Sequence, residues 1–547
     1  MADLPEFQVY DTTLRDGAQQ EGIVSTVEEK LEIARHLDDF GVDFIEGGWP
    51  GAVPKDTEFF RRAATELRLR NAQLAAFGAT RRPGGRADSD PQVAALLEAE
   101  TPVVTLVAKS HDRHVQLALR TTLAENLEMV RDTVRHLVAE GRRVFLDAEH
   151  YFDGYRANPD YALAVAAAAV ECGAEKVVLC DTNGGTLPQP LAEIVAETVA
   201  RGIPVGIHCH DDAGCAVANT LLAVEAGARH AQGTANGYGE RCGNANLFSV
   251  VANLVLKQGE PLRAAAQLPD MAQTARAIGD LVAIPVPPAA PYTGGSAFTH
   301  KAGLHTSALR IDASLYQHIE PERVGNSMRA LVSDLGGRSS IALKAREMGV
   351  EVAASDRRVG LAVERVKRLA EAGYSFESAD ASFALVLREE LDESPVPHAF
   401  EVESWRTVSF GGPRDTSDSS RVQVRLTRAG RSTVANGIAD HPVKALHRAV
   451  LAALIPVFPA VQRLELKSHE IRVLASTGVN GPAGVRVLLR FYDGEQQWGT
   501  VGVHRDMTAA ALLALRDAAD YLLADALDGD VDPELSKAAV GIASASA

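Results

Sequence analysis

The sequence has few cysteines, and their spacing suits neither a disulfide-stapled fold nor a cysteine zinc site. The five are odd in number and include no CxxC pair: they are Cys172, Cys180, Cys209, Cys215 and Cys242. This argues against a disulfide framework and against zinc held by thiolates. Unpaired thiols are typical of a reducing compartment, so we expect a cytoplasmic protein.

The sequence also lacks an excess of basic residues and any long apolar run. Lys and Arg number 55 against 72 Asp and Glu, a formal net charge of −17, whereas sequence-independent nucleic-acid binding needs a cationic surface. The longest run of small apolar residues, 162–170, is about half of what a membrane span needs. Residues 1–6 show no basic region leading into an apolar one, so we expect no signal peptide. We therefore predict a globular protein without nucleic-acid or membrane partners.

Apolar strand candidates alternate with helical periodicity through the first half of the chain. The strand candidates are 7–11, 43–46, 73–77, 103–107, 143–148, 176–180, 204–208 and 230–233. Strands that alternate with helices pair in parallel through right-handed crossovers. About eight such units fit the size of a (β/α)8 barrel, which we place at residues 1–265. An open doubly wound sheet is the alternative, but no GxGxxG motif follows the first strand.

The second half of the chain changes character twice. Residues 266–380 contain a proline-rich stretch at 284–291 and helical patterns, which indicate a helical linker region. Residues 381–528 predict a separate α+β module with a weak internal repeat of strands followed by an apolar helix. The predicted strands are 382–388, 421–426, 433–437, 464–475, 485–492 and 498–503, and the helices 442–456 and 508–526. The small polar residues of 529–547 predict a disordered tail.

Two polar motifs at predicted strand ends suggest a metal site. Arg15 and Asp16 follow the first strand, and His208 and His210 end the seventh, where residues two apart point to the same side. One carboxylate and two imidazoles can bind a divalent ion such as Mg, Mn, Zn or Co and leave room for a bidentate 2-keto acid. Arg15 can then hold the developing alkoxide. A surface ion pair and two structural histidines are the alternatives.

Further polar residues end other predicted strands. Glu149 is a candidate general acid or base, or an ion-pair residue at the barrel mouth. Thr182 offers a hydroxyl beside two glycines, and Asn244, in a glycine-rich loop after the eighth strand, could complete a metal sphere. Asp211 and Asp212, beside the histidine pair, are candidates to fix the histidine tautomers.

A short His/Gly motif lies beyond the barrel. His305 matters to the chemistry only if the linker folds over a barrel mouth, perhaps that of a partner subunit, and Tyr316 could join it. A purely structural histidine is the alternative.

Three of these motifs together resemble the 2-isopropylmalate/homocitrate/citramalate synthase family of metal-dependent Claisen-condensing barrels. The segments that carry the resemblance are DTTLRDGAQ (11–19), HCHDDAG (208–214) and NGYGERCGNANL (236–247). The resemblance covers nearly the whole chain, including a C-terminal module similar to the family's leucine- or isoleucine-sensing regulatory domain. Within the family, FIEGGWPG (44–51) and PKDTEFF (54–60) look like the citramalate synthase branch.

The resemblance implies an acyltransferase that condenses acetyl-CoA with pyruvate, on a route to isoleucine. It implies that Asp16, His208 and His210 bind a divalent metal, with Asn244 near them. Arg15 matches the keto-acid and oxyanion residue and Thr182 a substrate-carboxylate contact. Glu149, His305 and Tyr316 match residues of the catalytic centre. The resemblance favours His305, assisted by Glu149, as the base that removes the methyl proton, and leaves Glu149 as the other candidate. The resemblance further implies an isoleucine or leucine effector and a homodimer.

Three other functions stay open from the sequence. A metal-dependent lyase or carboxyltransferase on the same barrel would have less need of the module at 381–525. A non-enzymatic amino-acid sensor is disfavoured because Asp16, His208 and His210 are all present. Within the family, 2-isopropylmalate synthase differs by the larger side chain of its keto acid, and packing of that size discriminates by only about 1–3 kcal/mol.

Overall fold

A computed structural model describes most of the chain, which forms two compact units. The described residues are 7–301, 305, 308–309, 311–330, 337–347, 349–391, 398–412, 415–474, 484–524 and 527. The first unit comprises residues 1–298 and 319–328, and the second comprises 299–318 and 329–547. The predicted disordered tail, 529–547, lies outside the described residues.

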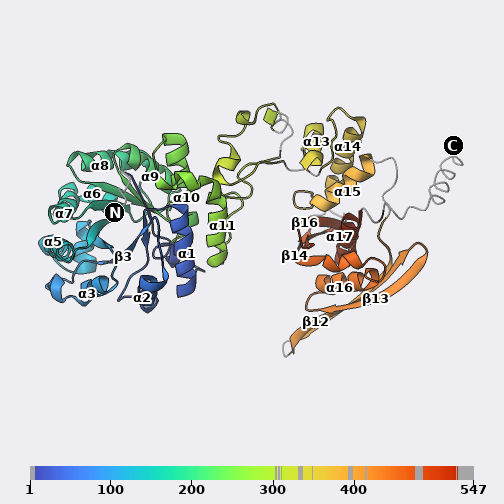
Figure 1. The fold of residues 1–547 in the computed structure, drawn as a ribbon, viewed down its shortest axis with the longest axis horizontal. Helices are drawn as coiled ribbons and strands as arrows, with labels where there is room; N and C mark the ends of the chain where they lie inside the picture. Colours follow the sequence, from blue (N-terminus) through green and yellow to red (C-terminus); the bar gives the residue numbers. More distant parts are fainter. Residues whose placement is uncertain are drawn as a thin grey trace, which may run out of the picture. The chain divides into compact units, whose positions relative to one another are not determined.

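The first unit is a closed barrel of parallel strands, as the alternating pattern predicts (Figure 1). The strands are β1 (Gln8–Asp11), β2 (Phe44–Glu46), β3 (Gln73–Ala79), β4 (Val103–Lys109), β5 (Arg143–Glu149), β6 (Lys176–Asp181), β7 (Val205–Cys209) and β8 (His230–Gly233). Strand β8 pairs with β1, with Gln8 opposite His230, and this pairing closes the barrel. All strand carboxyl ends therefore meet at one mouth, where barrel enzymes hold their sites.

Helices surround the strands, and short polar sequences fix where they begin. The helices of this unit are α1 (Val27–Phe40), α2 (Pro54–Glu66), α3 (Pro91–Glu98), α4 (Asp112–His114), α5 (Leu123–Ala139), α6 (Tyr151–Ala157), α7 (Pro159–Glu171), α8 (Pro188–Ala200), α9 (Ala216–Glu225), α10 (Leu247–Asn253) and α11 (Met271–Leu281). Thr26 and Glu29 form a capping box at the start of α1. Asp90 accepts hydrogen bonds from the first turn of α3.

The barrel has an aromatic interior below the mouth. Tyr10, Phe44 and Phe145, from β1, β2 and β5, pack there with Ala75 and Val103. The rings of Phe44 and Phe145 meet edge to face at 5.1 Å. Because this layer is filled, the open space of the barrel lies above it, among the strand ends.

The second unit contains a helical part and a duplicated α+β part, as predicted. Before the sheets, the described part of this unit includes helices α13 (Arg338–Glu347), α14 (Arg357–Glu371) and α15 (Asp380–Leu391). One repeat has strands β11 (Glu401–Gly412), β12 (Asp415–Arg428) and β13 (Arg431–Ala439) and helix α16 (Pro442–Leu454); the other has β14 (Glu465–Val473), β15 (Val485–Tyr492) and β16 (Gln497–His504) and helix α17 (Met507–Leu522). Each sheet is antiparallel with its strands in chain order.

One predicted strand is wrong. Residues 382–388 lie within helix α15, and the first strand of the repeat is β11 instead. A short run such as SFALVLR carries no period that separates a strand from a buried helix. The helix packs against α14, α17 and β16, which buries Phe383 and Leu387.

The cysteines and the helices bear on two expectations from the sequence, about disulfides and about membrane spans. All five cysteines are free in the structure, which agrees with the expected absence of a disulfide framework. No helix among the described residues is long and apolar enough to cross a membrane.

Candidate metal and substrate site

The structure brings the predicted Asp16, His208 and His210 together at the barrel mouth. Asp16 lies just after β1, and the histidines lie at the end of β7 and just beyond it. One carboxylate oxygen of Asp16 is 3.5 Å from Nε2 of His208, and the other is 3.7 Å from Nε2 of His210. All three side chains are buried, and their potential ligand atoms lie within 4.8 Å of one another. The spacing of two residues on a strand thus puts both imidazoles on one side.

The charges of this cluster suit a cation between its members. Burial lowers the pKa of His208 to about 4, so the imidazole is neutral near pH 7. Burial opposes the ionisation of Asp16, but the Arg15 charge and the two histidines hold its pKa well below the usual value. A carboxylate that faces the lone pair of a neutral imidazole is repelled unless a cation lies between them. Nitrogen and carboxylate donors of this kind fit a divalent transition metal or Mg²⁺.

Asn244 offers a further oxygen to the same cluster. Its Nδ2 donates hydrogen bonds to Asp16 Oδ1 at 3.2 Å and to the Tyr238 carbonyl at 3.0 Å. Its Oδ1 is buried and has no hydrogen-bond partner among the described residues. An orphaned carbonyl oxygen beside this cluster is consistent with a fourth metal ligand.

Gln232 on β8 contacts the His208 ring nitrogen that faces away from Asp16, a role that the sequence did not reveal. Its Oε1 lies 2.8 Å from Nδ1 of His208, and its Nε2 donates to Asp147 Oδ1 at 3.0 Å. Because Gln232 accepts at Nδ1, the Nε2 lone pair of His208 is turned toward Asp16. The expectation that Asp211 and Asp212 fix the histidines is wrong, since Asp211 accepts a hydrogen bond from the Ala216 N–H at the start of α9 and Asp212 pairs with Arg241.

Arg15 is fixed by three contacts at the same mouth. Its Nε lies 2.5 Å from Glu46 Oε1 and its Nη1 lies 3.0 Å from Asp16 Oδ2. The guanidinium also stacks over Phe77, with 3.8 Å between Cζ and the ring centroid. Glu46, at the end of β2, accepts a further hydrogen bond from Tyr10 at 2.7 Å and was not predicted as a site residue. Arg15 is therefore a rigid, fully charged donor next to the metal cluster.

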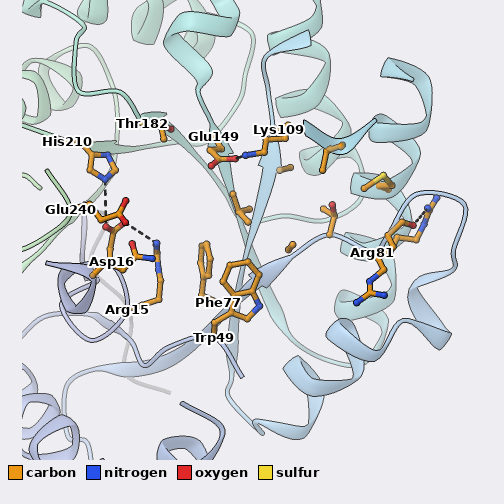
Figure 2. Close-up of a pocket in the computed structure, with 18 of the residues that line it drawn as sticks. Arg15, Asp16, Trp49, Phe77, Arg81, Lys109, Glu149, Thr182, His210 and Glu240 are labelled. Carbon is orange, nitrogen blue, oxygen red and sulfur yellow. Dashed lines mark hydrogen bonds and ion pairs between the residues drawn. The ribbon is translucent and has the colours of Figure 1, made fainter. Parts of the chain in front are cut away.

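Glu149 and Thr182 lie across the mouth from Arg15, at the ends of β5 and β6 (Figure 2). Glu149 forms an ion pair with Lys109, which lies opposite it in the β4–β5 register. Thr182 Oγ1 accepts a hydrogen bond of 2.8 Å from the backbone N–H of His150. Lys109 was missed by the sequence analysis, although a charged residue at the end of a buried strand is a usable signal.

These residues share one cavity of about 480 Å³. Its polar wall includes Arg15, Asp16, Lys109, Glu149, Thr182 and His210. Trp49 and Phe77 form part of the apolar wall, and their rings meet edge to face at 5.2 Å. A cavity of this size is typical of a small-molecule site.

His305 and Tyr316 belong to the second unit. Their rings stack on each other with centroids 4.2 Å apart and planes 28° from parallel. The structure thus brings these two predicted residues together, and their part in catalysis stays a prediction.

Three protein-family models match successive parts of the chain. The family model HMGL-like matches residues 6–278, the homocitrate synthase post-HMGL domain-like model matches 292–374, and the LeuA allosteric (dimerisation) domain matches 377–523. The first match covers the barrel and half of the chain, and the third covers helix α15 and both sheet repeats.

Curated relatives match nearly the whole chain. An (R)-citramalate synthase of Streptomyces coelicolor is 55% identical over 94% of this chain and 96% of its own length. One of Aquifex aeolicus is 44% identical over 94% of this chain and 97% of its own. A probable 2-isopropylmalate synthase of Methanopyrus kandleri is 34% identical over 89% and 92%. The chain therefore belongs to the 2-isopropylmalate/homocitrate/citramalate synthase family, and it is an enzyme of the citramalate synthase branch.

Proposed function

We propose that this enzyme condenses acetyl-CoA with pyruvate and water to give (R)-citramalate and CoA, a step toward isoleucine. The observation that carries the proposal is the convergence of Asp16, His208 and His210 beside Arg15, in one cavity with Glu149 and Thr182. The (R)-citramalate synthases that align over 94% of the chain support the choice of substrates.

Asp16, His208 and His210, with Asn244, would hold the divalent cation. A cation bound there supplies Lewis acidity that polarises the carbonyl of the 2-oxo acid. Arg15 is charged and immobile, so it can bind the oxo-acid oxygens and stabilise the alkoxide that forms as the new carbon–carbon bond is made. Thr182 can donate its hydroxyl proton to the oxo-acid carboxylate, because its Oγ1 accepts rather than donates in the bond to His150.

Glu149 is a carboxylate of the described cavity, and we assign it the role of base. Its carboxylate would remove a proton from the acetyl methyl group, and the resulting carbanion attacks the ketone carbon of pyruvate. Water then cleaves the thioester and releases the CoA thiol, which draws the condensation forward. His305 and Tyr316 remain candidates for further acid–base roles, on the strength of the family resemblance.

A panel of 2-oxo acids tests this proposal. Purified enzyme supplied with Mn²⁺ or Mg²⁺ and acetyl-CoA should release free thiol with pyruvate at a higher kcat/KM than with 2-oxoisovalerate. The product should be (R)-citramalate by chiral chromatography. A preference for 2-oxoisovalerate would reassign the enzyme to the 2-isopropylmalate branch, and thiol release with no oxo acid present would refute the condensation.

We further propose that residues 377–523 bind isoleucine or leucine and hold two chains in a dimer. The match to the LeuA allosteric (dimerisation) domain supports both roles. If isoleucine or leucine is the effector, adding that amino acid should lower thiol release by the full chain. A chain ending at Ala379, before α15, should keep turnover, lose that inhibition and sediment as a smaller species. Inhibition that persists in the shortened chain would place the effector site elsewhere.

A further inference from the structure

The cavity extends well beyond the residues assigned to the oxo acid. Asp16 and His210 line one end, whereas Arg81, Arg82 and Pro83 line the other, and Figure 2 shows Arg81 on the far side of the cavity from Asp16. Its volume of about 480 Å³ is far more than a three-carbon acid fills. The far end therefore has room for part of the second substrate.

The loop that forms the far end is held rigidly. Arg81 donates its backbone N–H to Thr133 Oγ1 at 3.0 Å, and its guanidinium lies 2.8 Å from Glu125 and 2.8 Å from Asp132. These two carboxylates balance the Arg81 charge, and its side chain is only 7% exposed. Arg81 therefore anchors the loop and has no charge to offer a ligand.

Arg82 differs from Arg81 in the exposure and the pairing of its side chain. Its backbone N–H is fixed by Asp90 Oδ2 at 2.9 Å, but its side chain is exposed and lines the cavity. Among the described residues, no carboxylate forms an ion pair with its guanidinium. Arg241, another arginine of the lining, is bound by both carboxylate oxygens of Asp212. A fixed backbone thus presents one uncompensated cation at the cavity rim of a chain whose net charge is −17.

We propose that Arg82 binds the phosphate groups of acetyl-CoA, with the pantetheine arm lying in the cavity between Arg82 and the metal cluster. This inference rests on the proposed function, because it takes acetyl-CoA as the second substrate. Val107, Leu119 and Met129 supply apolar surface along the cavity for the arm. A guanidinium offers paired N–H donors that match phosphate oxygens, and a rigid loop reduces the entropy lost on binding.

The test compares Arg82→Gln with Arg86→Gln, using two thioesters. Arg86 lies in the same loop but pairs with Asp88 at 2.5 Å and does not line the cavity. Acetyl-CoA carries the phosphates, and S-acetylpantetheine has the same thioester and arm without them. We expect Arg82→Gln to raise KM for acetyl-CoA about tenfold, the effect of one lost charge-assisted hydrogen bond. Its kcat, its KM for pyruvate and its kcat/KM for S-acetylpantetheine should match those of Arg86→Gln.

Two outcomes would overturn the assignment of Arg82. One is an unchanged KM for acetyl-CoA, and the other is an equal loss with both thioesters, which would mean that the substitution disturbs the loop. Calorimetric titration with CoA separates this failure from a failure of the proposed function. If the wild type releases no thiol with any oxo acid, the proposed function fails, while a tenfold weaker CoA Kd for Arg82→Gln would still support the phosphate site.

Discussion

Gln232 Oε1 lies 2.8 Å from Nδ1 of His208, and this contact determines which nitrogen of the histidine faces Asp16. Gln232 is itself held by Asp147, which accepts a hydrogen bond from its Nε2 at 3.0 Å. Both Gln232 and Asp147 are buried. The orientation of one candidate metal ligand on β7 therefore depends on side chains from β8 and β5.

Replacing Gln232 with Leu should weaken metal binding without unfolding the barrel. The substitution removes the acceptor at Nδ1, so His208 loses its fixed tautomer, and we expect the Kd for Mn²⁺ or Zn²⁺ to rise about 10- to 100-fold. Competition with a chromophoric chelator measures this Kd directly. Gln189→Leu, at the exposed start of α8, is the matched control. Equal metal affinity in the two variants would show that Gln232 has no such role.

Replacing Lys109 with Met should lower kcat more than it raises KM for pyruvate. The ammonium pairs with Glu149, and without it the carboxylate is less well oriented. Loss of a positioned base costs about 10²- to 10⁴-fold, so a misplaced one should cost part of that range.

Lys109→Arg serves as the control for that experiment, because it keeps a cation opposite Glu149 in the β4–β5 register. It should recover most of the activity. If Lys109→Arg and Lys109→Met lower kcat equally, the positive charge at position 109 does not account for the loss of activity.

The sequence predicted the parts of the site that follow from local spacing. Asp16 lies in the loop after a strand, and His208 and His210 are two residues apart, so their meeting needs only the barrel order. Gln232, Glu46 and Lys109 were missed as site residues because what marks each of them is a contact with a side chain from another part of the barrel. Their partners lie on strands far away in the sequence, and the register between those strands is not readable from one chain.

The prediction of the fold was right where the hydrophobic pattern was long and wrong where the pattern was short. Eight strand–helix alternations identified the barrel, and glycines before two apolar helices identified the repeat. Residues 382–388 were assigned to a strand because their apolar run is too short to show a helical period. The contacts of α15 with α17 and β16 favour a helix here, and they involve residues more than 100 positions away in the sequence.

The repeated glycines give a stability prediction. A Cβ on Gly437 would lie 2.0 Å from the Ala445 carbonyl oxygen, and one on Gly502 would lie 2.0 Å from that of Ala510. In both repeats the third strand thus touches the backbone of the following helix. Gly437→Ala or Gly502→Ala should destabilise the second unit by about 1–3 kcal/mol or more. Urea unfolding followed by tryptophan fluorescence in a Trp49→Phe background, which leaves Trp405 and Trp498 of this unit, measures the change. Gly430→Ala is the control, because Gly430 has open space around it, although its φ is positive.

The stability of the second unit should depend on pH through Asp517. Burial raises the pKa of Asp517 to about 7, although Ser382 donates a hydrogen bond to it at 2.5 Å. The folded unit therefore keeps this proton between pH 4 and 7, where the unfolded chain has lost it, so its contribution to stability falls as pH rises. Asp517→Asn should gain stability relative to the wild type over that window, by roughly 1–4 kcal/mol. Parallel urea titrations at pH 5 and pH 7.5 check this, and a difference that does not change with pH would contradict it.

Anomalous diffraction from crystals grown with Mn²⁺ and pyruvate tests the central claim most directly. The account predicts one strong peak flanked by Asp16, His208 and His210, with pyruvate density between that peak and Arg15 and with its carboxylate toward Thr182. The peak should be absent from Asp16→Ala crystals that retain the wild-type fold. A metal bound elsewhere in the barrel, or pyruvate that lies away from these residues, would contradict the account.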